Sequence, residues 1–115
     1  MFDKDKANLL AIIDSASKIK KFTASFSDAD SFYDDEKTFD AVLMNFVAIG
    51  EFVKRLSVDL TEKHPEVPWI KIHNLRNLFA HNYFGVDAEE VWQIIQGDLE
   101  PLVRDIKKIL KDTHR

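Results

Sequence analysis

The chain of 115 residues has no cysteine and contains only three glycines and three prolines. The absence of thiols excludes disulfide bonds, thiolate metal sites and a catalytic cysteine, and so few glycines and prolines leave little sequence for flexible linkers. No apolar run approaches the roughly 20 residues that a membrane-spanning helix needs, and the charged start Met1-Phe2-Asp3-Lys4 does not resemble a signal peptide. We therefore expect a single domain over residues 1–115, located in the cytoplasm and not in a membrane.

Positive charge is also scarce, since 16 Lys and Arg face 20 Asp and Glu for a net charge of −4. A protein that holds nucleic acid by a broad basic surface has the opposite balance, so any such contact must be local. The candidate cations are Arg76, Lys54, Arg55 and Lys71, and for the last three we favour simple solvation. The four histidines show no spacing typical of metal ligands. We therefore expect no metal and no cofactor.

Apolar residues recur at three- and four-residue steps through most of the chain, which predicts helices throughout. The first helix is expected to include Leu9 to Phe26, and the second to run from Phe39 to near His64-Pro65, where proline disfavours helical geometry in the residue before it. Between them, the acidic segment Asp28 to Glu36 is typical of an exposed loop and a helix start.

The third helix should start at Pro68, with Trp69 as a core or interface anchor. Asp87 and Glu90 fit a capping box for the fourth helix, and Gly97 and Pro101 should bend that helix. Short connections between four helices predict the fold class: all-α, as an antiparallel four-helix bundle with its fourth helix kinked near Gly97-Pro101.

Aromatic residues are numerous, with nine phenylalanines in the chain. Their number exceeds what the inward stripes of four helices accommodate, and the surplus falls among Phe32, Tyr33, Phe52, Phe84 and Trp92. Excess aromatic surface favours an oligomeric interface over a monomer.

Three groups suited to phosphate chemistry lie within the stretch Arg76-Asn77-Leu78-Phe79-Ala80-His81-Asn82-Tyr83-Phe84. Arg76 carries a permanent charge on a planar fork of donors that fits phosphate, and His81 can exchange a proton near neutral pH. Tyr83 adds a hydroxyl and a stacking face, and Asn77 is a further polar candidate for support. The alternative is that these residues are merely solvated, as isolated Arg and His residues on amphipathic helices usually are.

Helical geometry separates these groups. At about 100° per residue, Arg76 and Tyr83 return to nearly the same face, whereas His81 lies about 140° away from Arg76. Either the helix ends near Tyr83, with Gly85 as its left-handed cap, or a second chain of a symmetric dimer supplies the missing group.

Glu51 follows Gly50 in the middle of the second predicted helix, beside the apolar positions Ile49 and Val53. Its carboxylate could orient His81 or bind a ribose hydroxyl, as a third group orients a catalytic base. It could equally be an exposed residue that pairs with Lys54 or Arg55. The sequence leaves these two interpretations open.

Three ordered segments resemble a known family. The motif Arg76-x4-His81-x-Tyr83, followed by Phe84-Gly85-Val86-Asp87, resembles the HepT-like branch of the HEPN superfamily. The run from Ala48 to Ser57 is similar to that family's second-helix signature, and Pro65-Glu66-Val67-Pro68-Trp69 to its connecting loop. The resemblance extends over most of the chain, from about Phe39 to Leu110.

The resemblance implies a dimeric, metal-independent ribonuclease toxin in which Arg76 and His81 are catalytic. It also implies a partner, a minimal nucleotidyltransferase antitoxin that transfers AMP to Tyr83. Adenylylation would place a bulky negative group where the RNA phosphate should bind.

Two other functions stay open at this stage. The chain could be a non-catalytic subunit that binds a nucleotide or substrate for a separate nucleotidyltransferase, with Arg76 and His81 as phosphate ligands. It could also be a plain helical dimer whose polar motif only fixes the interface.

Overall fold

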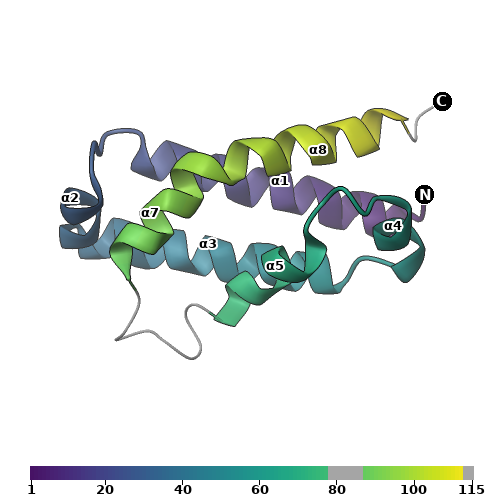
Figure 1. Cartoon of the computed structure of the whole chain (residues 1–115), viewed down its shortest axis with the longest axis horizontal. Coiled ribbons are helices and arrows are strands. Elements are labelled where there is room, and N and C mark those ends of the chain that lie inside the picture. The colour runs from purple at the N-terminus through teal and green to yellow at the C-terminus, as the bar shows by residue number, and fades with distance from the viewer. Residues whose placement is uncertain (78–86, 113–115) are drawn as a thin grey trace.

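Two long helices form the centre of the fold in the computed structural model, which describes residues 1–77 and 87–112. Helix α1 (Asp3–Thr23) and helix α3 (Glu36–Lys54) run antiparallel and pack along each other (Figure 1). Their apolar stripes meet in the core, where side chains such as Leu9, Ile12, Leu43 and Phe46 are fully buried. The described residues form helices and no strands, which confirms the predicted all-α class.

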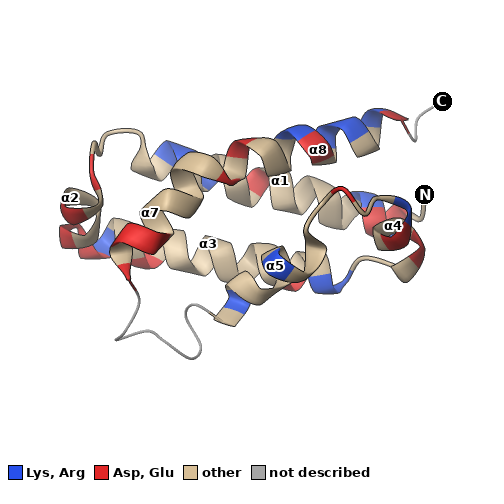
Figure 2. Ribbon diagram, in the orientation of Figure 1, with Lys and Arg blue, Asp and Glu red and all other residues tan. Residues whose placement is uncertain are grey.

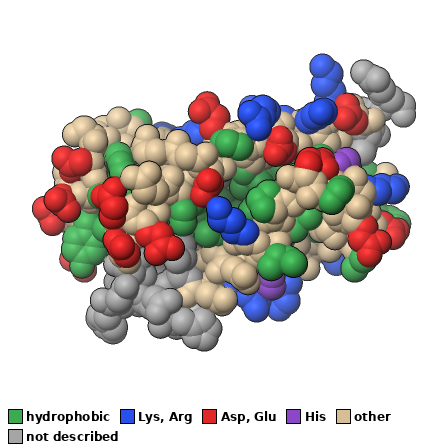
Figure 3. Space-filling view, in the orientation of Figure 1, with side chains coloured by type: hydrophobic (Ala, Val, Ile, Leu, Met, Phe, Trp, Pro, Cys, Tyr) green, Lys and Arg blue, Asp and Glu red, His purple; other side chains and the backbone are tan. Residues whose placement is uncertain are grey.

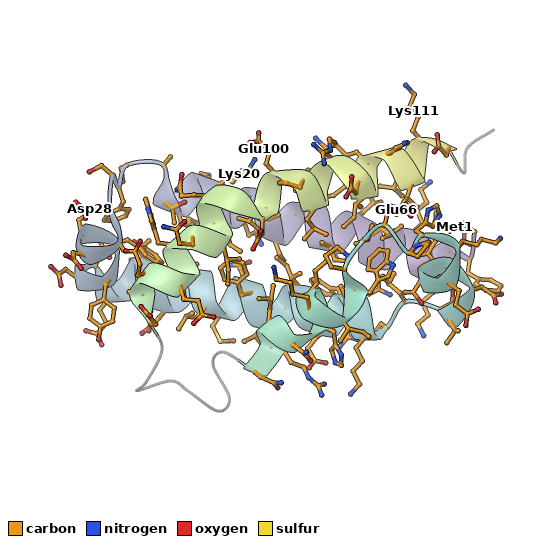
Figure 4. All side chains as sticks on the ribbon, in the orientation of Figure 1. Met1, Lys20, Asp28, Glu66, Glu100 and Lys111 are labelled. Atoms are coloured by element: carbon orange, nitrogen blue, oxygen red, sulfur yellow. The ribbon has the colours of Figure 1, made fainter. Side chains whose placement is uncertain are left out.

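Helices α7 (Ala88–Gly97) and α8 (Leu99–Asp112) complete the core. Helix α8 lies on α1, with Leu102, Ile106 and Ile109 buried beneath it. Figure 4 shows Lys20 of α1 and Glu100 of α8 pointing toward each other, and their charged atoms are 3.5 Å apart. The predicted kink is present as a full break, because α7 ends at Gly97 and a new helix starts after Asp98.

The α7 cap differs in detail from the predicted capping box. Asp87 is the N-cap as expected, but its carboxylate accepts a hydrogen bond from the N–H of Glu89 at 2.9 Å and not from that of Glu90.

The predicted end of the second helix, near His64-Pro65, is wrong. Helix α3 stops at Lys54, and a separate short helix, α4 (Val58–Lys63), follows. The break is explained by the buried carboxylate of Asp5, which accepts hydrogen bonds from the Ser57 N–H at 2.8 Å and the Ser57 hydroxyl at 2.6 Å. Ser57 also caps α4 by accepting from the N–H of Leu60 at 3.2 Å. Serine is among the residues preferred at the start of a helix.

The acidic segment after α1 is predicted from the sequence to be an exposed loop and a helix start. The helix start is confirmed, since α3 begins at Glu36, but the predicted loop is wrong because a short helix forms within the segment. Helix α2 (Ala29–Asp34) is capped by Asp28, whose carboxylate accepts hydrogen bonds from the Ser31 N–H and hydroxyl, both at 2.8 Å. These bonds lower the pKa of Asp28, the backbone bond contributing most. Charged residues line this end of the molecule, as Figure 2 shows in red around α2.

The aromatic surplus is smaller than the sequence predicts, because α2 turns Phe32 inward. Phe32 is fully buried and its ring centroid lies 5.2 Å from that of Phe39 and 5.6 Å from that of Trp92. Trp92 is 9% exposed, whereas Tyr33 is 53% exposed. Phe32 and Trp92 are therefore core residues, and of the five aromatics only Tyr33 is shown as largely exposed in the described part of the chain.

Candidate functional site

The polar site is built on a short helix that follows the loop after α4. Helix α5 (Trp69–His73) starts after Pro68 as predicted, and tightens into the 3-10 turn η1 (Asn74–Arg76). Trp69 is buried, and its indole N–H donates to the carbonyl oxygen of His64 at 2.9 Å, which confirms it as a core anchor. Both α5 and η1 pack on α3, along the lower edge of the molecule in Figure 1.

Arg76, at the end of η1, reaches Glu51 on α3. Arg76 Nη1 lies 3.5 Å from Glu51 Oε1, and the side chains are 32% and 40% exposed. The structure thus brings together two of the predicted site residues that are 25 positions apart. Of the partners weighed from sequence for Glu51, neither Lys54 nor Arg55 is the one that it binds.

Among the described residues, the hydrogen bond to Glu51 is the one that is seen for the Arg76 guanidinium. Arginine has five N–H donors, and the hydrogen bond to Glu51 uses one of the two on Nη1. A pair this exposed contributes only about 0.2–1 kcal/mol to stability. The pair matters because it positions the Arg76 side chain, which is 32% exposed, where an anion can reach it.

Of the other predicted site residues, the structure describes Asn77 but not His81 or Tyr83. Asn77 follows η1 directly and is partly buried. His81 and Tyr83, like Gly85 and Phe84, lie outside the described residues, so the predicted geometry that joins them to Arg76 stays a prediction. In the sequence, the segment that carries them connects η1 to α7.

Two of the remaining candidate cations, Lys71 and Arg55, have other contacts. Lys71 Nζ lies 3.7 Å from Asp98 Oδ2 at the junction of α7 and α8. The Arg55 guanidinium lies over the ring of Phe52, 5.9 Å from its centroid. Neither interaction involves Arg76 or Glu51.

His73, at the end of α5, is a residue that the sequence analysis did not single out. Its Nε2 atom is buried and has no hydrogen-bond partner among the described residues. Nothing in the sequence distinguishes it from the other histidines.

A cavity of about 120 Å³ lies behind α5, between α3 and the junction of α7 and α8. Figure 3 shows green apolar side chains recessed on this face of the molecule. Its lining is mainly apolar and includes Phe46, Ile72, Leu75, Leu99 and Leu102, but neither Arg76 nor Glu51. An apolar cavity does not suit a phosphodiester, so the Arg76–Glu51 pair is the better candidate for the site.

Two classes of feature are absent from the described part of the chain. No group of three or more His, Asp or Glu residues there could hold a metal ion. Within the same residues, no helix combines the length and apolar character needed to cross a membrane.

Together these features define a protein that is helical over the residues the structure describes, with a partly exposed arginine paired with a carboxylate of α3. The family model described as "Ribonuclease HepT-like" matches residues 12–109. The chain belongs to this family.

Proteins similar to the chain carry names consistent with that family. "Putative RNase MJ0127" of Methanocaldococcus jannaschii is 36% identical over 107 residues, which cover 93% of this chain and 88% of that protein. "Probable ribonuclease HepT" of Thermococcus cleftensis is 34% identical over 93 residues, covering 81% and 84% of the two chains. No solved structure matches the chain with significance.

Proposed function

We propose that the protein is a metal-independent RNA endonuclease that cleaves with Arg76 and His81, within a single domain and in the cytoplasm. Membership of the ribonuclease family supports the enzyme class. The observation that carries the site assignment is the partly exposed Arg76 side chain, paired with Glu51 through one of its donors. A cation placed in this way fits the phosphoryl oxygens of an RNA strand.

In the proposed mechanism, His81 removes the proton from the ribose 2′-hydroxyl as general base, or gives one to the leaving oxygen as general acid. The 2′-oxygen attacks the adjacent phosphorus, and the bond to the leaving oxygen breaks. Arg76 stabilises the negative charge that builds on the phosphoryl oxygens during this step. His81 carries one of the two protons that move in this step, and water takes or supplies the other. The products are a 2′,3′-cyclic phosphate and a 5′-hydroxyl end.

The activity is tested by incubating the purified protein with a mixed RNA pool in the presence of a chelator. Cleavage supports the proposal. An intact pool, combined with nucleotide binding that weakens in Arg76→Ala, would instead support a non-catalytic nucleotide-binding subunit, because the same free donors fit the phosphate of a nucleotide.

The enzyme is proposed to be a homodimer that joins two copies of the site. Large apolar side chains are exposed on α3, which carries Glu51, and on α5, which leads into η1: Met44 is 53% exposed and Ile70 is 79% exposed. Isolated exposed apolar residues are ordinary, but an exposed apolar side chain on each of these two helices suits an interface. Such an interface would let His81 of one copy act beside Arg76 of the other.

We expect light scattering to give twice the chain mass of 13.3 kDa for the wild type. Ile70→Asp should give the mass of a monomer, because it places a charge in the interface. Val58→Asp is the matched control, since Val58 is 67% exposed on α4 and should leave the dimer intact. A concentration-independent monomer mass for the wild type would contradict the dimer.

The ribonuclease is further proposed to be the toxin of a toxin–antitoxin pair, neutralised when a minimal nucleotidyltransferase adenylylates Tyr83. The phenol oxygen attacks the α-phosphorus of ATP, pyrophosphate leaves, and the phenol proton passes to solvent. The resulting phosphodiester adds negative charge and bulk seven residues from Arg76, at the motif proposed to bind the RNA phosphate.

Co-expression with the cognate nucleotidyltransferase is expected to raise the mass of this chain by one or more AMP units. Tyr83→Phe should prevent the increase, because it keeps the ring and removes only the nucleophilic oxygen. Tyr33→Phe serves as the control, since Tyr33 is 53% exposed and lies on α2, outside the motif that carries Tyr83. Intact mass spectrometry reads the result, and a mass increase that persists in Tyr83→Phe would exclude this tyrosine as the acceptor.

A further inference from the structure

Gly50 lies in the interior of α3, at the point where the η1 turn packs on that helix. A methyl group added to Gly50 would lie 2.7 Å from the carbonyl oxygen of His73, 2.9 Å from the backbone nitrogen of Arg76 and 3.0 Å from Arg76 Cβ. Ordinary van der Waals contact begins at 3.4 Å. Two of these three atoms belong to the backbone, so no side-chain rotation can relieve the contact.

Backbone conformation does not explain this glycine. Gly50 has no positive φ, so any residue could adopt its conformation. Glycine in a helix interior is less favourable than alanine. The packing of η1 against α3 is therefore the physical reason for a glycine at this position. A glycine inside a helix often has such a packing reason.

The residue after Gly50 completes the arrangement. Glu51 extends from the same turn of α3, and its carboxylate holds the Arg76 guanidinium at 3.5 Å. Gly50 thus sets how near the Arg76 backbone comes to α3, and Glu51 sets where the guanidinium points.

We propose that Gly50 and Glu51 are positioning residues for Arg76, which fix its guanidinium in the place where it acts on RNA. The proposal rests on the ribonuclease function proposed above. Neither residue needs to touch the reacting phosphate, since both act through Arg76.

The size of the effect follows from the geometry. In Gly50→Ala, the contact with His73 must lengthen by about 0.7 Å to reach the limit of ordinary contact, and η1 has to move away from α3. A misplacement of about 1 Å in a catalytic group costs about 10²-fold in rate. We therefore expect Gly50→Ala to lower the rate of RNA cleavage about 10- to 100-fold.

The experiment measures single-turnover cleavage of one RNA oligonucleotide by the full-length protein, at a temperature where circular dichroism shows each variant folded. Gly97→Ala is the matched control, because Gly97 also lies in a helix but has open space around its Cβ position. It should cleave at the wild-type rate. The decisive comparison repeats Gly50→Ala in the Arg76→Ala background, where we expect no further loss, because a residue that acts through Arg76 has nothing left to position.

Three results would overturn the proposal. The first is wild-type cleavage by Gly50→Ala. The second is an equal loss in both backgrounds, which would show that Gly50 acts on the fold in general. The third is wild-type cleavage by Glu51→Gln, a variant that keeps the backbone and the side-chain shape.

Glu51→Gln also decides the matter if Gly50→Ala does not fold. We expect Glu51→Gln to lower the cleavage rate about 10-fold, and we expect no such loss in the Arg76→Ala background.

Failure of the proposed function looks different from failure of the positioning role. Full activity of Arg76→Ala removes Arg76 from the mechanism and both proposals with it. An inactive Arg76→Ala beside an active Gly50→Ala and an active Glu51→Gln keeps the function and rejects the positioning role alone.

Discussion

Arg76→Ala is expected to slow RNA cleavage about 10²- to 10³-fold, the usual cost of removing one group that stabilises charge in a transition state. The helical fold should persist, because the Arg76 side chain is 32% exposed and its ion pair with Glu51 is weak. His81→Ala should cost about 10²–10⁴-fold, as the loss of a general acid or base does. Cleavage of a labelled oligonucleotide under chelator measures both rates.

Arg104→Ala is the matched control for this experiment. Arg104 also has an ion pair at 3.5 Å, with Asp105, but it lies on α8 and its side chain is 75% exposed. It should cleave like the wild type. Equal rates for Arg76→Ala and Arg104→Ala would contradict the assignment of Arg76, since general charge removal would then explain any change.

Phe32→Ala should lower the free energy of unfolding by about 3–5 kcal/mol, the range for deletion of a fully buried phenylalanine. Phe32 contacts Phe39 of α3 and Trp92 of α7, so its ring joins α2 to both helices. Loss of the ring leaves a cavity that the three elements can close only in part. Denaturant unfolding followed by circular dichroism measures the change.

Tyr33→Ala is the neighbouring control, because Tyr33 is 53% exposed and contacts Phe39 only at its edge, 5.1 Å between centroids. Its cost should stay below about 1.5 kcal/mol, the upper range for one aromatic pair. Similar costs for the two variants would show that the aromatic cluster does not anchor α2 and α7 as described.

Periodicity predicted the long helices because burial along one stripe produces a repeat of three and four residues. It could not locate the break after Lys54, since Val53, Leu56 and Leu60 are all buried and remain in phase across it. The break depends on Asp5, which is 52 residues from Ser57 in the sequence. Local patterns carry no trace of such a contact.

The same reason explains what the sequence revealed of the site. Arg76 was identifiable from its chemistry and its spacing to His81 and Tyr83. The partner of Arg76 was not identifiable. Lys54 and Arg55 lie close to Glu51 in the sequence, so spacing alone favours them as the cations that pair with its carboxylate. Aromatic burial was also underestimated, since the inward turn of Phe32 depends on α2, whose six residues are too few to show a helical period.

The central claim is that this protein cleaves RNA by attack of the ribose 2′-oxygen, without a metal. One measurement tests it directly: cleavage under chelator of an RNA oligonucleotide and of the same oligonucleotide with 2′-deoxyribose at every position. The account predicts cleavage of the ribose strand and none of the deoxy strand, because the deoxy strand lacks the nucleophile. Cleavage of both strands at similar rates, or of neither until a divalent metal is added, would contradict it.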